Sequence, residues 1–289
     1  MGAKSSGFSL IELILALTMS LGIGMIVLQM FHQNERVFRD QSLILETQQS
    51  ARVVISQIAD ELRMAGQGMP MYASTSDLDS TEATAVILAG SGSSRINFRA
   101  GLSSIETTVT AAMPVDFVIG DSRTVSVGAA TPFQIGKFVY VTGPGENDTW
   151  AWMRAEILQT NAAAKTLTLI PRHAMNVRFI DRPIVSLDEA VSFFIASGSI
   201  KRATASNLSD QTNPVWSASS EIGRNFRSLQ FTYFDKDNTS VTPQSLAERL
   251  SISRIDVRVV AETSQTLTRG GRQEFALTMR TIPRNVQIR

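Results

Sequence analysis

The chain has no cysteine and only two histidines, His32 and His173. Without cysteine there are no disulfides, thiolate metal sites, cysteine nucleophiles or lipid-modified cysteines. Two histidines make a multi-histidine metal site, or catalysis driven by histidine, unexpected. The composition therefore favours a protein that is not an enzyme and that holds no cofactor and no metal.

The chain also lacks an excess of charge of either sign. Lys and Arg total 27 against 26 Asp and Glu, a formal net charge of +1, so there is no general attraction for nucleic acid. With 289 residues, 43% of them hydrophobic and 18% charged, the sequence is not typical of a disordered protein. Its length allows one large domain or two ordinary ones, each with a core.

An apolar run near the N-terminus is the most informative segment. Residues 8–31 read FSLIELILALTMSLGIGMIVLQMF, with Glu12 as the only charged side chain and no proline. A helix of this length spans about 36 Å, against about 30 Å for the hydrocarbon core of a bilayer. A plain signal anchor and a cleaved signal peptide are the alternatives, but neither gains from a carboxylate that costs about 2.5–3.5 kcal/mol near the bilayer centre. We therefore expect a transmembrane span in which Glu12 serves a purpose other than targeting.

A short polar leader, residues 1–7, precedes the run and ends in Gly7, which Phe8 follows. Glu12 is then the fifth residue from Phe8. This GFSLIELILAL motif resembles the type IV pilin superfamily. The resemblance implies cleavage between Gly7 and Phe8 by a membrane-embedded prepilin peptidase, and N-methylation of Phe8. It also implies that Glu12 sets the register of the subunit in a filament, by facing the new N-terminal amine of an adjacent subunit.

Residues 32–65 continue the span as an amphipathic helix. Its apolar stripe repeats at alternating fours and threes, and consists of Ile44, Gln48, Ala51, Ile55, Ile58, Leu62 and Ala65. Gly66 and Gly68, followed by Pro70, predict where the helix ends. Together the two segments form a rod, residues 8–65, whose first half has no domain of its own to cover it. In pilins, that half packs against its equivalents in neighbouring subunits.

Basic residues give a weak signal for the orientation of the span. Lys4 favours a cytoplasmic leader, but Arg36 and Arg39 lie just beyond the opposite end. The pilin-like motif therefore decides the topology. It implies a single-pass protein of the inner membrane with its head in the periplasm, and a position on the pilus at the cell surface after assembly.

The rest of the chain, residues 66–289, predicts a β-rich head and hence an α+β fold. Short β-branched runs alternate with Gly, Ser, Asn and Asp clusters. The expected strands are residues 84–89, 95–98, 116–119, 124–127, 137–142, 150–158, 166–170, 191–196, 228–234, 252–262 and 274–281. Several alternate apolar and polar residues, as in an antiparallel sheet with one buried face. Residues 111–175 are expected to form a small β subdomain inserted into the pilin-like head.

The C-terminal segments sharpen the resemblance. Residues 233–235 (YFD), 255–258 (IDVR) and 284–285 (RN) look like parts of PilW-type minor pilins and of the related J-type minor pseudopilins of type II secretion. Length favours the PilW type. We expect a minor pilin that assembles into a type IV pilus in a priming or tip complex. The alternatives are a J-type minor pseudopilin and a pilus-tip subunit that binds DNA or a surface.

This interpretation implies several partners. They are the prepilin peptidase, inner-membrane lipid before assembly, and other minor pilins and the major pilin through the N-terminal helix. Nucleic acid stays open as a partner because the last forty residues are rich in arginine, although solvated strand faces explain these residues more simply. Asp235, Asp237 and Asn238 could begin a calcium loop, but the glycine and the distant glutamate of an EF-hand are missing, and a hairpin turn is favoured.

Overall fold

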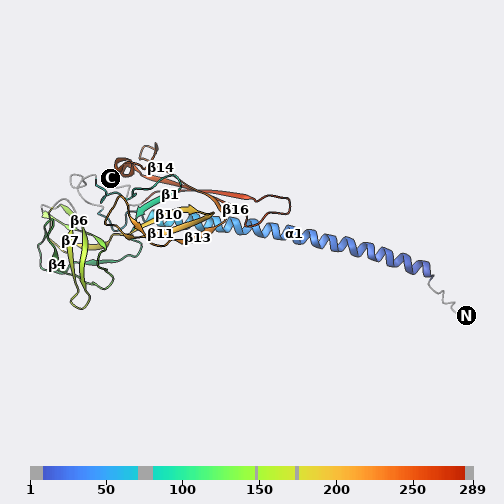
Figure 1. The fold of residues 1–289 in the computed structure, drawn as a ribbon, viewed down its shortest axis with the longest axis horizontal. Coiled ribbons are helices and arrows are strands. Elements are labelled where there is room, and N and C mark those ends of the chain that lie inside the picture. Colours follow the sequence, from blue (N-terminus) through green and yellow to red (C-terminus); the bar gives the residue numbers. More distant parts are fainter. Residues whose placement is uncertain (1–8, 71–80, 147–148, 173–175, 284–289) are drawn as a thin grey trace.

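The computed structural model describes residues 9–70, 81–146, 149–172 and 176–283. A long helix, α1 (Leu10–Arg63), is followed by a head built mainly of strands, with a second, short helix, α2 (Leu246–Ser251), near its end. Figure 1 shows α1 projecting from the head, with its N-terminal end far from the strands. The strands pair antiparallel throughout the described residues. The expected α+β fold is confirmed.

Helix α1 is continuous over 54 residues, which corresponds to a length of about 81 Å. It begins after Ser9, whose backbone is extended, and ends at Arg63, after which Gly66 and Gly68 adopt positive φ angles of 82°. Glycine adopts this conformation without a steric penalty, so the pair turns the chain out of the helix. Gly22 and Gly24 lie inside the helix without interrupting it. The predicted rod is thus present in the described residues as a single helix.

Two sheets form the part of the head that packs on α1. The first runs in the order β15-β14-β16-β17, with β14 (Phe226–Phe234), β15 (Ser240–Val241), β16 (Arg254–Glu262) and β17 (Glu274–Thr281). The second runs β1-β10-β11-β12, with β13 also paired to β11. Its strands are β1 (Arg95–Arg99), β10 (Ala190–Ala196), β11 (Ser199–Asn207), β12 (Val215–Trp216) and β13 (Ser220–Arg224). Inward residues of both sheets and the last turns of α1 share one core.

A further sheet has its own core and lies at the end of the head away from the N-terminal end of α1 (Figure 1). Its order is β2-β9-β5-β6-β7-β4. The strands are β2 (Glu106–Thr108), β4 (Arg123–Ser126), β5 (Phe138–Pro144), β6 (Trp150–Asn161), β7 (Thr166–Pro171) and β9 (Ile184–Leu187), and a separate pair consists of β3 (Val115–Phe117) and β8 (Val177–Phe179). We call these strands the distal sheet. They span residues 106–187, more than the 111–175 expected, because β2 and β9 extend the edge beside β5.

A buried ion cluster joins the distal sheet to the rest of the head. Asp188 follows β9 and accepts hydrogen bonds from Arg99 Nε at 3.1 Å and from Arg154 Nε at 2.8 Å. All three side chains are 1% exposed. Further guanidinium N–H groups donate to backbone carbonyls, including that of Leu208, and to the side-chain oxygen of Gln211, so both cations have additional hydrogen-bond partners. The cluster ties β1, β6 and the chain between β9 and β10 together.

The observed strands differ from the predicted ones in two ways. Residues 84–89 do not form a strand; Ile87 makes a single bridge to Phe98, and Leu88 N–H donates to the carbonyl of Asn97. Conversely, several short or polar strands were not expected, namely β2, β8, β9, β11, β12, β13 and β15, together with helix α2. The other predicted strands are present, β17 with the predicted bounds and the rest with one or both ends shifted.

Candidate assembly interface

The first half of α1, residues 10–31, is not covered by any other part of the chain that the structure describes. Its large apolar side chains are between 43% and 77% exposed, from Val27 to Leu10. One 18-residue window of the helix has a mean hydropathy of 2.3. By length and composition, α1 can therefore cross a membrane. An apolar surface this extensive is stable only against lipid or against other apolar surfaces.

Glu12 lies at the start of this exposed segment, in the first turn of α1. Its Oε2 atom accepts a hydrogen bond from the backbone N–H of Ser9 at 3.1 Å, half of a capping box. A carboxylate is favourable here because it faces the positive end of the helix dipole. Glu12 thus has an intrachain partner in the monomer. Gly7 and Phe8, the expected cleavage and methylation residues, lie outside the described residues.

The middle of α1 is fastened to the head by one loop. The turn between β16 and β17 contacts the helix at Thr268, whose N–H donates to Asp40 Oδ2 at 2.9 Å. Arg39 Nη2 donates to Thr268 Oγ1 at 3.4 Å. Partial desolvation raises the pKa of Asp40, but the hydrogen bonds from Thr268 and the charge of Arg39 outweigh it and leave that pKa below its usual value. The head therefore begins to hold α1 at this level.

The second half of α1 is packed against the sheets. The predicted stripe is confirmed: Ile44 and Gln48 are half-buried, and its members from Ala51 to Ala65 are buried. Thr47, Val54 and Ala59 are buried as well, which the heptad pattern did not include. At the edge of the stripe, Glu61 accepts two hydrogen bonds from Arg202 Nε, each 2.9 Å long. The helix and β11 are thus linked by charge as well as by packing.

The candidate calcium loop is a hairpin turn. Asp235 Oδ1 accepts hydrogen bonds from the backbone N–H groups of Asp237 at 2.9 Å and Thr239 at 2.8 Å, and the turn joins β14 to β15. The carboxylate thereby stabilises the turn from within. Across the described residues, no group of three His, Cys, Asp or Glu side chains lies close enough to hold a metal ion.

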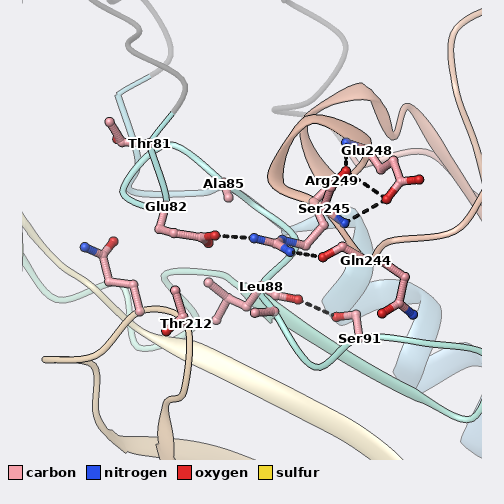
Figure 2. Close-up of polar contacts among 12 residues, drawn as sticks. Thr81, Glu82, Ala85, Leu88, Ser91, Thr212, Gln244, Ser245, Glu248 and Arg249 are labelled. Carbon is pink, nitrogen blue, oxygen red and sulfur yellow. Dashed lines mark hydrogen bonds and ion pairs between the residues drawn. The ribbon is translucent and has the colours of Figure 1, made fainter.

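The arginines near the C-terminus are largely paired with acids. Figure 2 shows Arg249 of α2 between the carboxylate of Glu82 and the backbone carbonyl of Gln244, and its side chain is buried. Arg254 and Arg280 both contact Asp256, and Arg272 pairs with Glu262. Each of these four cations therefore has an acidic neighbour, and Arg254 and Arg280 share the one carboxylate of Asp256.

A cleft of about 480 Å³ opens between β11 and the distal sheet. The charged residues in its wall already have partners within the chain. Lys137 Nζ donates to the carbonyl of Ser206 at 2.7 Å, Glu189 accepts from Ser103, and Arg202 binds Glu61. The cleft is therefore a weaker candidate for a binding site than α1. The exposed apolar surface of α1 contacts no other part of the described chain.

Comparisons with protein families, with curated proteins and with solved structures found no match for this chain. The N-terminal motif and the exposed apolar half of α1 are therefore the features that indicate a function.

Proposed function

We propose that this protein is a minor pilin of a type IV pilus, which enters the filament as part of a priming or tip complex. The observation that carries the proposal is the contrast along α1. Residues 10–31 are apolar and uncovered, and the same helix continues without a break into a half that anchors a β-rich head. Lipid covers the exposed half before assembly, and the helices of other pilins cover it afterwards.

Cleavage after Gly7 supplies the second part of the mechanism. It converts the nitrogen of Phe8 from an amide into an amine, which is largely protonated at neutral pH. This cation and Glu12 of an adjacent subunit attract by about 4 kcal/mol at 4 Å and an effective dielectric near 20, before desolvation is subtracted. An unpaired carboxylate among packed apolar helices is costly, so the pair favours one axial register over its neighbours. The prepilin peptidase and other pilins are the partners this mechanism requires.

Substitutions at Glu12 test this role. Glu12→Gln retains a side-chain oxygen that can accept from Ser9 N–H and removes the charge, whereas Glu12→Leu removes both. We expect both variants to insert and to be cleaved, and both to be lost from sheared pili, because the register depends on charge. Wild-type amounts of Glu12→Gln in the pili would contradict the ion pair and favour helix capping as the role of Glu12. Recovery of the wild-type chain in a secretion pseudopilus instead of a pilus would favour the J-type alternative.

Processing is tested separately. Gly7→Val should leave an uncut precursor in the membrane, heavier by the leader of seven residues. Intact-mass spectrometry distinguishes this precursor from a mature chain that begins at N-methylated Phe8. Ser6→Val is the matched control, since it adds a branched side chain one residue away from the proposed cut. A mature mass for Gly7→Val would contradict the assigned cleavage site.

A further inference from the structure

The β16–β17 hairpin reaches along α1 toward the N-terminal end of the helix (Figure 1). Its loop, residues 263–273, closes in a tight turn in which Leu267 N–H donates to the carbonyl of Gly271 at 2.9 Å. Gly270 and Gly271 have φ angles of 89° and 79°, which this turn requires. The contact of Thr268 with Asp40 fixes the loop on the helix. The head thus presents a defined loop on its side nearest the apolar segment.

Among the described residues, two cations at this level have no acidic partner. The acids nearby already have other partners. Asp40 accepts a hydrogen bond from Thr268, Glu262 pairs with Arg272, and Glu35 Oε2 lies 3.8 Å from His32 Nδ1. Arg36 on α1 and Arg269 at the hairpin turn are both exposed. In the ranges that the structure describes, neither forms an ion pair, whereas most other arginines of the head do.

Distance along the helix places Arg36 at a membrane surface and the loop with Arg269 slightly above it. Arg36 lies five residues, or about 8 Å, beyond Phe31, and Asp40, which holds the loop, lies about 14 Å beyond it. The headgroup layer adds about 5–8 Å on each side of the hydrocarbon core. Residues 10–31 span about 33 Å, slightly more than the core, so the helix fits by tilting. A tilt toward the hairpin lowers the loop to the headgroups, and long arginine side chains extend the reach further.

We propose that Arg36 and Arg269 bind the phosphates of anionic phospholipids and thereby dock the head on the outer face of the membrane before assembly. This inference rests on the membrane insertion in the proposed function. Arginine binds phosphate oxygens through two parallel N–H donors, which suits headgroups at a surface. The site also gives a purpose to Arg36, which lies on the side of the span where the distribution of basic residues disfavours it.

The absence of cysteine makes a direct test simple. In the full-length chain, Thr266→Cys places a single spin label on the exposed part of the loop. The labelled protein is inserted in nanodiscs of phosphatidylcholine, with or without phosphatidylglycerol, and exposure of the label to a water-soluble relaxation agent is measured. Each cation near an anionic surface strengthens the contact by about fivefold. In nanodiscs that contain phosphatidylglycerol, we expect the ratio of docked to free heads to fall about thirtyfold in the double variant Arg36→Gln/Arg269→Gln. The ratio should then equal that of the wild type in phosphatidylcholine alone.

Arg182→Gln is the matched control, since it removes the same charge from an exposed site beside the distal sheet and should leave the ratio unchanged. Equal label exposure in the two lipids, or in the double variant and the wild type, would overturn the inference and leave insertion intact. A loop that is protected only after partner subunits are added would assign the site to a protein and also overturn it. Failure of the chain to enter nanodiscs would overturn the proposed function as well.

Discussion

The two halves of α1 have the same secondary structure and opposite surroundings. In the second half Ala51, Ile58 and Leu62 are 0% exposed against the sheets, whereas in the first half Leu10 is 77% exposed. Helix propensity does not separate them, because the first half is rich in Leu and Met and the second in Gln, Glu and Arg, all of which favour helices. The difference shows that one half completes the fold, whereas the other is left without cover from the described residues. Substitutions in the two halves should therefore have different consequences.

The largest expected contrast is between two truncations to alanine. Ile58→Ala opens a cavity between α1 and the sheets and should lower the free energy of unfolding of the head by about 2–5 kcal/mol. Leu17→Ala, in the exposed half, should change it by less than about 0.5 kcal/mol. Denaturant unfolding of the full chain in micelles, followed by the fluorescence of buried Trp152, measures both. Equal losses in the two variants would mean that the exposed half also contributes to the fold of the head.

The same substitution at two glycines sharpens the contrast. A Cβ at Gly223 would lie 2.6 Å from Cγ2 of Val54 on α1 and 2.6 Å from Cε2 of Phe226, so Gly223→Ala should destabilise the head by about 1–3 kcal/mol. A Cβ at Gly22 meets no atom within 4 Å, and Gly22→Ala should stabilise the first half of the helix by about 1 kcal/mol. Hydrogen exchange resolved along α1 separates the two effects. Destabilisation by Gly22→Ala would reveal a contact that the isolated chain does not show.

The smallest effect is expected at the boundary between the halves. The pKa of Asp40 is lowered in the folded chain, so its contact with Thr268 is at full strength above the ordinary value of 3.8 and is lost as the pH falls through the lowered value. The protection of the Thr268 amide against exchange should therefore decrease as the pH falls below 3.8. Asp40→Ala should remove this protection at every pH. Protection that persists in the variant would show that the loop stays on α1 without the carboxylate.

The spacing of apolar residues predicted the helix and most strands, because helices and strands each repeat their buried positions with a characteristic period. Helix α1 was expected over residues 8–65 and spans Leu10–Arg63. Strand β11 was missed because its SIKRATASN sequence is polar and lacks strict alternation, although β10 and β13 pair with it on either side. Helix α2 was missed despite a readable signal, the Ser245–Glu248 capping box shown in Figure 2.

Only part of the candidate site could be predicted from the sequence. Glu12 and the apolar run follow from the sequence, because motif and composition are local. The contact between Asp40 and Thr268 joins residues 228 positions apart in the chain. Nothing in the sequence around either residue indicates this contact. Similarly, Arg99, Arg154 and Asp188 come together only because β1, β6 and the segment between β9 and β10 meet at one point of the fold. Such long-range polar contacts depend on tertiary structure and not on periodicity.

The buried cluster of Arg99, Asp188 and Arg154 has a mechanical consequence. A pull on the distal sheet acts on a joint in which one carboxylate holds two guanidinium groups, and separating them would leave buried charges without partners. The joint should therefore resist a bending load better than an apolar contact of the same area, which slides without losing a specific bond. Force applied at the far end of the head would pass through β1 to the core around α1, and so along the axis of the helix.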